Sequence, residues 1–123
     1  CCMSLSRNVG LSTLVGTKLV SAIQPGDCCY AMNIKTRKRE YVSVTKMEKV
    51  FHESILSISG RGVAIQCTED QTFIVMNERN ELVLLPWLQI QDSDMILVHA
   101  RPQAFIHRTH LVAQALAYRD YVY

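Results

Sequence analysis

Hydrophobic and polar residues alternate in many short runs along this chain of 123 residues, and helix-length amphipathic stretches are nearly absent. A period of two places successive side chains on opposite faces of a strand, whereas a helix repeats its apolar positions every three or four residues. The runs are rich in β-branched residues and recur at a spacing of roughly ten residues, which is typical of all-β proteins. The sequence therefore predicts an all-β, highly curved fold of many short strands.

Turn-forming residues separate the expected strands. Gly60, Arg61 and Gly62 predict a hairpin loop, and Pro25, Gly26 and Asp27 predict a tight turn. The segment 110–118 suits either a short helix or a strand. The expected strands cover residues 18–23, 28–33, 41–51, 55–58, 63–67, 72–76, 82–85 and 95–99.

Composition limits the class of protein. Hydrophobic residues make up 49% of the chain and charged residues 20%, as in an ordinary folded domain, so we expect a single domain over residues 1–123. No apolar run approaches the roughly 18 residues of a membrane span, and no signal peptide is visible. The net charge is only +2, and the basic cluster at 35–39 predicts a solvated turn. We therefore expect neither a membrane nor a nucleic-acid partner.

The potential ligands and nucleophiles are sparse. The five cysteines contain no C-x-x-C pair, which predicts free thiols in a reducing compartment rather than a zinc site. His107 and His110 would share a helical face, but no further ligand lies at a matching spacing. The chain also lacks a G-x-S-x-G nucleophile motif. We expect no metal, no cofactor and no hydrolysis of an external substrate.

Several segments resemble, in order and spacing, the Hint family, which comprises inteins, the autoprocessing domain of hedgehog proteins and bacterial intein-like domains. Cys1 stands where an intein has its nucleophile. The other matching segments are Ala22-Ile-Gln-Pro-Gly-Asp27, Cys67-Thr-Glu-Asp-Gln-Thr-Phe73, Leu85-Pro-Trp-Leu-Gln-Ile90, Asp94-Met-Ile-Leu-Val98 and Tyr121-Val-Tyr123. This resemblance implies a flattened horseshoe of short curved strands in which the two chain ends meet at a reaction centre.

The resemblance also implies a site. In the family, the first thiol attacks the preceding carbonyl carbon, while a T-x-x-H motif orients the peptide and protonates its nitrogen. Thr68 matches the threonine, but Gln71 replaces the histidine. Because an amide cannot deliver a proton, we expect thioester formation to be slow. Asp70 is included in the candidate site, either as a hydrogen-bond partner of Gln71 or as a solvated turn carboxylate.

The chain stops at Tyr123, before the hairpin that in the family carries an aspartate, a late histidine and a terminal asparagine. We expect roughly 15–20 residues to be missing from the fold, given ordinary strand lengths. Either this is the large N-terminal fragment of a split intein, or the tail was deleted. A partner strand would then add to an exposed edge at 110–123.

Three functions remain open. The first is protein splicing in trans, with a complementary C-terminal intein fragment and flanking extein polypeptides as partners. The second is a hedgehog-like or bacterial intein-like domain that cleaves only its N-terminal junction. The third is a non-catalytic β interaction module. In the first two cases the protein acts once on itself, as an autocatalyst in the compartment of its host, which we expect to be the cytoplasm.

Overall fold

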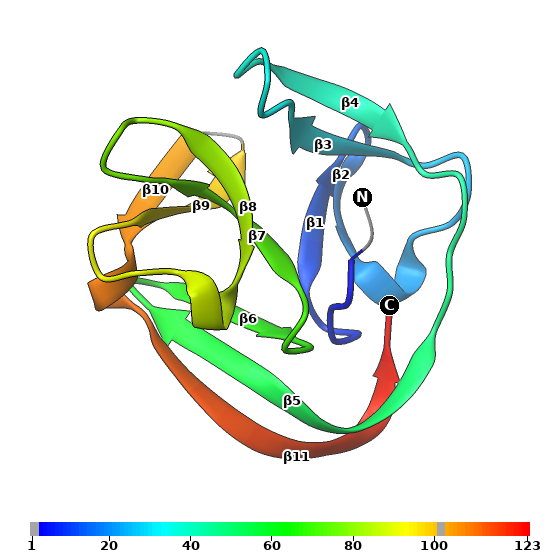
Figure 1. Cartoon of the computed structure of the whole chain (residues 1–123). Helices are drawn as coiled ribbons and strands as arrows, with labels where there is room; N and C mark the ends of the chain where they lie inside the picture. Colours follow the sequence, from blue (N-terminus) through cyan, green and yellow to red (C-terminus); the bar gives the residue numbers. More distant parts are fainter. Residues whose placement is uncertain (1–2, 101–102) are drawn as a thin grey trace.

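A computed structural model describes residues 3–100 and 103–123. In these residues the chain forms antiparallel β-sheets joined by short turns, which confirms the all-β prediction (Figure 1). The strands are β1 (Gly10–Thr13), β2 (Gly16–Leu19), β3 (Cys28–Met32), β4 (Arg39–Ser43), β5 (Val50–Gly60), β6 (Val63–Cys67), β7 (Thr72–Met76), β8 (Leu82–Pro86), β9 (Met95–Ala100), β10 (Gln103–His107) and β11 (Val112–Val122). Three 3-10 turns are η1 (Val20–Ala22), η2 (Trp87–Gln89) and η3 (Arg108–His110) among the described residues.

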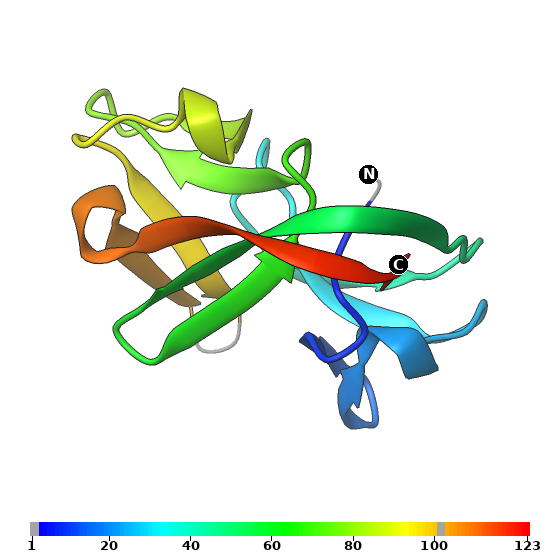
Figure 2. The same ribbon diagram turned by 90° about the horizontal axis from the view of Figure 1, so that it is seen from below.

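The strands divide into three sheets, as described for these residues. Their strand orders are β2-β1-β3-β4, β10-β9-β7-β8 and β11-β5-β6. In the third sheet β5 and β11 form a long antiparallel ribbon that bends around one side of the molecule (Figure 1) and crosses beneath the other strands (Figure 2). The ribbon gives the fold its horseshoe outline.

Alternating apolar residues from all three sheets meet in one core. Ile58, Val75 and Ile96 are each at most 2% exposed, and each contributes about 1.5–3 kcal/mol through burial of its side chain. Trp87 is 4% exposed, and the guanidinium of Arg108 lies 3.8 Å from the centre of its ring. The core cluster consists of Leu5, Val20, Leu56, Ile58, Val63, Cys67, Val75, Trp87, Ile90, Ile96 and Leu111.

The beginning and the end of the described chain lie side by side (Figure 1). The amides of Leu5 and Tyr123 donate to each other's carbonyl oxygens at 2.9 and 2.8 Å, and Ser6 forms a bridge with Val122. On its other side, the Ser6 amide donates to the Gln66 carbonyl at 2.8 Å. Residues 4–6, which we call the closing segment, thus join β6 to the end of β11.

The structure corrects several expected boundaries. The run 18–23 contains the end of β2 and then η1, and the run 41–51 is divided between β4 and β5. Just past β4, Val44 continues the pairing with β3 by exchanging backbone hydrogen bonds with Gly26 and Asp27, and the chain then leaves the pairing before β5 begins at Val50. Strands β1 and β10 were not predicted. The ambiguous segment 110–118 lies mostly in β11, an edge strand of its sheet.

Candidate functional site

Cys1, the predicted nucleophile, lies outside the described residues, as does its neighbour Cys2. The other predicted residues, Thr68, Asp70 and Gln71, lie together in the turn between β6 and β7. This turn contacts the closing segment, which continues from the first residues of the chain. The structure therefore brings three of the four predicted residues next to the peptide that leads to Cys1.

Thr68 is the buried residue of the turn. It is 5% exposed, and its backbone amide donates to the Ser4 carbonyl at 3.0 Å. Its hydroxyl donates to the exposed carboxylate of Asp70. The sequence left open whether Asp70 would bond to Gln71; in the structure its hydrogen-bond donor is Thr68. Because the only hydroxyl proton points at Asp70, the oxygen of Thr68 presents its lone pairs and can act as an acceptor.

Gln71 also binds the closing segment, through the amide of Ser4 rather than through its carbonyl. Its side-chain oxygen accepts the Ser4 amide at 2.6 Å, and its side-chain nitrogen donates to the Thr72 carbonyl at 2.8 Å. The backbone amide of Gln71 closes the turn by donating to the backbone carbonyl oxygen of Thr68 at 3.2 Å. Among the described residues, the second N–H of this side-chain amide has no partner. The turn can therefore orient a peptide by hydrogen bonds, but neither side chain is an acid of useful strength.

Cys67 is adjacent to this site but is unsuited to act as its nucleophile. The residue is 0% exposed and lies opposite Leu5 on one side and Leu56 on the other. Burial, with a smaller contribution from the Asp70 carboxylate, raises the pKa of the Cys67 thiol to about 11. The thiol is the form present at neutral pH, and thiolate is the reactive species. Cys67 therefore belongs to the core.

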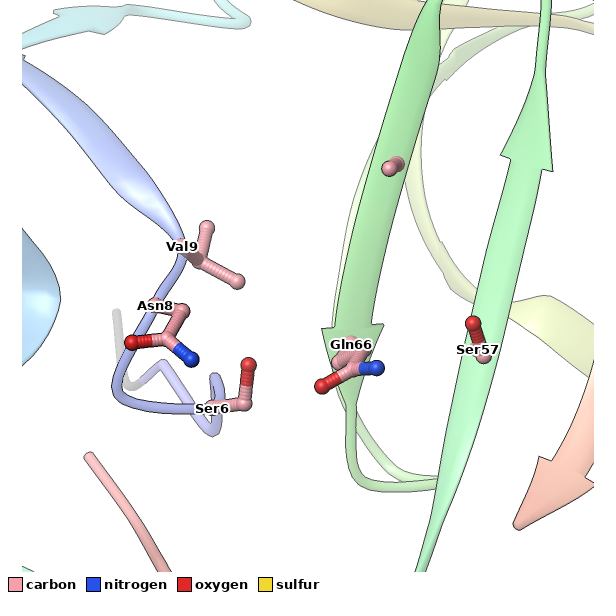
Figure 3. A pocket seen from close by; sticks show the side chains of 6 residues that line it. Ser6, Asn8, Val9, Ser57 and Gln66 are labelled. Carbon is pink, nitrogen blue, oxygen red and sulfur yellow. The ribbon is translucent and has the colours of Figure 1, made fainter.

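A small pocket of mixed polar and apolar lining lies beside Ser6, the last residue of the closing segment (Figure 3). Ser6, Asn8 and Val9 form one wall, and Ser57 and Gln66 lie across from them on β5 and β6. Its volume is about 230 Å³. Its polar lining consists of hydroxyl and amide groups, which suit neutral hydrogen-bonding groups rather than a charged cofactor.

The remaining candidate groups can be placed as well. The rings of His107 and His110 meet edge to face with centroids 5.6 Å apart, and Arg61 lies 3.3 Å from the Nε2 atom of His110. Among the side chains that the structure describes, those of residues 3–98 and 103–123, there is no group of three or more His, Cys, Asp or Glu that could hold a metal ion. In the same residues, no helix is long and apolar enough to cross a membrane.

An ion pair that the sequence did not predict joins the two ends of the described chain. The guanidinium of Arg7 contacts both carboxylate oxygens of Asp120, at 2.9 and 2.6 Å. This pairing raises the pKa of Arg7, and the hydrogen bond from Arg7 is the largest cause of the lowered pKa of Asp120. The two residues are 113 positions apart, so no local pattern could have indicated the contact.

No protein-family model and no curated protein matches the sequence. Solved structures do match over almost the whole chain. A GSH-linked, splice-inactive variant of the AceL NrdHF class 3 split intein is 14% identical with a TM-score of 0.85, covering 98% of this chain and 83% of that one. The bacterial intein-like domain from Clostridium thermocellum is 17% identical with a TM-score of 0.78, covering 99% and 84%. The chain has the Hint fold.

A third match agrees. The DnaB intein from Synechocystis sp. PCC 6803 is 13% identical with a TM-score of 0.73, covering 98% of this chain and 84% of its own. The fold expected from the resemblance is thus confirmed, at low sequence identity in every comparison. Fold alone does not define chemistry, which depends on the residues at the site.

Proposed function

We propose that this Hint domain carries out protein splicing in trans as the N-terminal fragment of a split intein. The observation that carries the proposal is the position of the turn at Thr68 and Gln71, which binds the closing segment where the two chain ends meet. The split intein among the similar structures supports a second fragment as partner. That fragment would supply the asparagine and the downstream nucleophile.

The first step would be an N-to-S acyl shift at Cys1. The Cys1 sulfur attacks the carbonyl carbon of the preceding residue, the C–N bond breaks, and the thiol proton is transferred to the departing nitrogen. The products are a thioester and the free amino group of Cys1, so no cofactor is consumed. A thiol suits this step because its pKa of about 8.5 leaves a usable thiolate fraction near neutral pH.

The turn would position the peptide rather than supply the proton. Thr68 would accept a hydrogen bond from the scissile N–H, because its own proton is donated to Asp70. Gln71 would hold the chain at Ser4. A positioned general acid contributes about 10²–10⁴-fold, so its replacement by glutamine predicts a slow first step.

Mixing a fusion protein with candidate C-terminal fragments tests the proposal. A reporter is joined upstream of Cys1, the C-terminal fragments end in asparagine and carry a second reporter, and the ligated product is measured by mass. We expect ligation with the natural sequence and with Cys28→Ala, a matched control thiol away from the site, and none with Cys1→Ala.

Other outcomes favour the alternatives. Release of the upstream reporter by added thiol, without ligation, would favour an N-terminal autocleavage domain. If neither product forms, even in Gln71→His, the splicing proposal is wrong and a non-catalytic interaction module becomes the better account.

A further inference from the structure

We propose that Arg7 and Asp120 form a positioning pair that sets the end of β11 against the closing segment and is needed for the ligation half of the reaction. The inference rests on the proposed function for its chemical consequence. Its structural part, the control of the contact between the chain ends, stands independently of splicing. The proposal is carried by a β-bulge, by two separate sets of contacts on the first residues of the chain, and by the geometry of the ion pair.

A β-bulge in β11 turns Asp120 toward Arg7. Ala117 lies opposite Ser54, whereas Asp120 lies opposite His52, so two residues of β11 face one residue of β5. One of these two, Arg119, has φ of +52°. Bulges bend a strand and redirect its side chains, and they are frequent beside active sites. This bulge places the Asp120 carboxylate within hydrogen-bond distance of Arg7, the residue that follows the closing segment.

Besides the bond from the Ser6 amide to Gln66, two tethers hold residues 4–7, and the ion pair belongs to the second of them. Upstream, Ser4 is bound by the Thr68 amide and the Gln71 side chain. Downstream, Leu5 is bound to Tyr123, and Arg7 to Asp120. The first tether connects the segment that leads to Cys1 with the β6–β7 turn. The second connects it with the end of β11.

These tethers would serve different steps. Thioester formation would need the peptide at Cys1 to reach the turn, and the upstream tether holds Ser4, from which the chain leads to Cys1, at that turn. Transfer of the acyl group to a downstream nucleophile would also need the C-terminal fragment, which would continue the fold beyond Tyr123, to be in place beside Cys1. Weakening the Arg7–Asp120 pair should therefore spare the first step and slow the later ones.

The surroundings of the pair favour the charged form of both residues. Lys49 lowers the pKa of Asp120 further, and the Tyr121 amide donates to Asp120 at 2.7 Å. His52 faces Asp120 across the ribbon, and Tyr118 is the other residue of the bulge. The side chains of Arg7 and Asp120 are 45% and 34% exposed, so salt should weaken the pair. Its contribution comes from a bidentate geometry that a lysine could not reproduce.

Amide hydrogen exchange tests the structural part without requiring any splicing activity. In Arg7→Gln and in Asp120→Asn, we expect the amides of Leu5 and Tyr123 to exchange about three- to tenfold faster. The amides of Ser4 and Thr68 should be unchanged, and the double variant should exchange no faster than either single variant. Lys46→Gln is the matched control. It breaks an exposed ion pair between the Lys46 and Glu48 side chains, whose charged atoms are 2.7 Å apart, and this pair lies away from the contact between Leu5 and Tyr123.

The chemical part is tested in the same variants with an upstream reporter and a C-terminal fragment. We expect release of the reporter by thiol to stay within about twofold of the natural sequence, while ligation falls about tenfold. Equal losses in both reactions, or no loss in either, would overturn the positioning role. Uniform exchange changes, or none at Leu5 and Tyr123, would overturn the structural part. If the natural sequence neither cleaves nor ligates, the proposed function fails, and hydrogen exchange still decides whether the pair controls the contact.

Discussion

Replacing Gly60 with alanine should be among the most damaging single-methyl changes in this protein. Gly60 ends β5 with φ of +148°, and a Cβ added there would lie 2.1 Å from the His110 carbonyl oxygen. The same Cβ would lie 3.3 Å from the Leu111 Cα atom. These are backbone atoms, so no side chain can rotate away. The start of β11 would have to shift by about 1 Å in a closely packed region.

The expected cost combines two effects. Overpacking that moves the backbone typically costs about 1–3 kcal/mol, and an unfavourable positive φ costs a similar amount, which gives about 2–6 kcal/mol for Gly60→Ala. That is a large part of the 5–15 kcal/mol of stability typical of natural domains. Gly62 offers a matched control in the same hairpin. Its φ is +78°, but an added Cβ there meets no atom within 4 Å, so Gly62→Ala should cost only about 1–2 kcal/mol.

Urea unfolding followed by circular dichroism measures both variants. The slope of the unfolding free energy against urea should stay constant, so that the shift in midpoint reports stability directly. If Gly60→Ala unfolds at the same urea concentration as Gly62→Ala, Gly60 does not lie as close to the His110 carbonyl as the structure shows.

Three further predictions concern the site and its surroundings. Gln71→His should accelerate thiol-induced release of an upstream reporter about 10- to 100-fold at neutral pH, and an unchanged rate would show that proton supply is not limiting. Cys67 should resist alkylation in the folded protein while Cys28 reacts, and reaction of Cys67 at the rate of Cys28 would contradict its burial. The free energy of unfolding should fall as pH rises from 9 toward 11, because the Cys67 thiol ionises at a lower pH in the unfolded chain than in the folded protein. Because the pKa of Asp120 is lowered, the contribution of its ion pair should be complete above the usual carboxylate pKa of 3.8 and be lost as pH falls below it. The protection of the Tyr123 amide, which is its exchange rate compared with the intrinsic rate at the same pH, should therefore decrease down that range in the natural sequence but not in Asp120→Asn.

Short apolar strands between clear turns were predictable from the sequence. The runs 63–67 and 72–76 coincide with β6 and β7, because each is a short, mostly apolar run with β-branched residues and is bounded by polar or glycine-containing turns. The segment 110–118 was ambiguous because Leu111, Val112 and Leu116 fit both a helix and a strand. Its pairing with β5 decides the outcome, and that pairing is a long-range interaction that local propensity does not contain.

The candidate site shows the same limit. Thr68 and Gln71 were recognisable from a motif, whereas their shared partner, Ser4, depends on how the chain closes. The hydrogen bond between Thr68 and Asp70 could have been predicted from the sequence, since polar side chains in turns often form hydrogen bonds with groups two residues away. The Arg7–Asp120 pair was not, because the register at Asp120 is set by a bulge.

The most direct test of the central claim is mass spectrometry of a reporter joined upstream of Cys1 and treated with a small thiol. The account predicts release of the reporter as its thioester, slowly, together with a domain that begins at Cys1. The same treatment of Cys1→Ala should release nothing, and Cys2→Ala should behave like the natural sequence. Release that persists in Cys1→Ala, or a reporter that stays attached in the natural sequence and in Gln71→His alike, would contradict the claim that this protein activates its own N-terminal peptide bond.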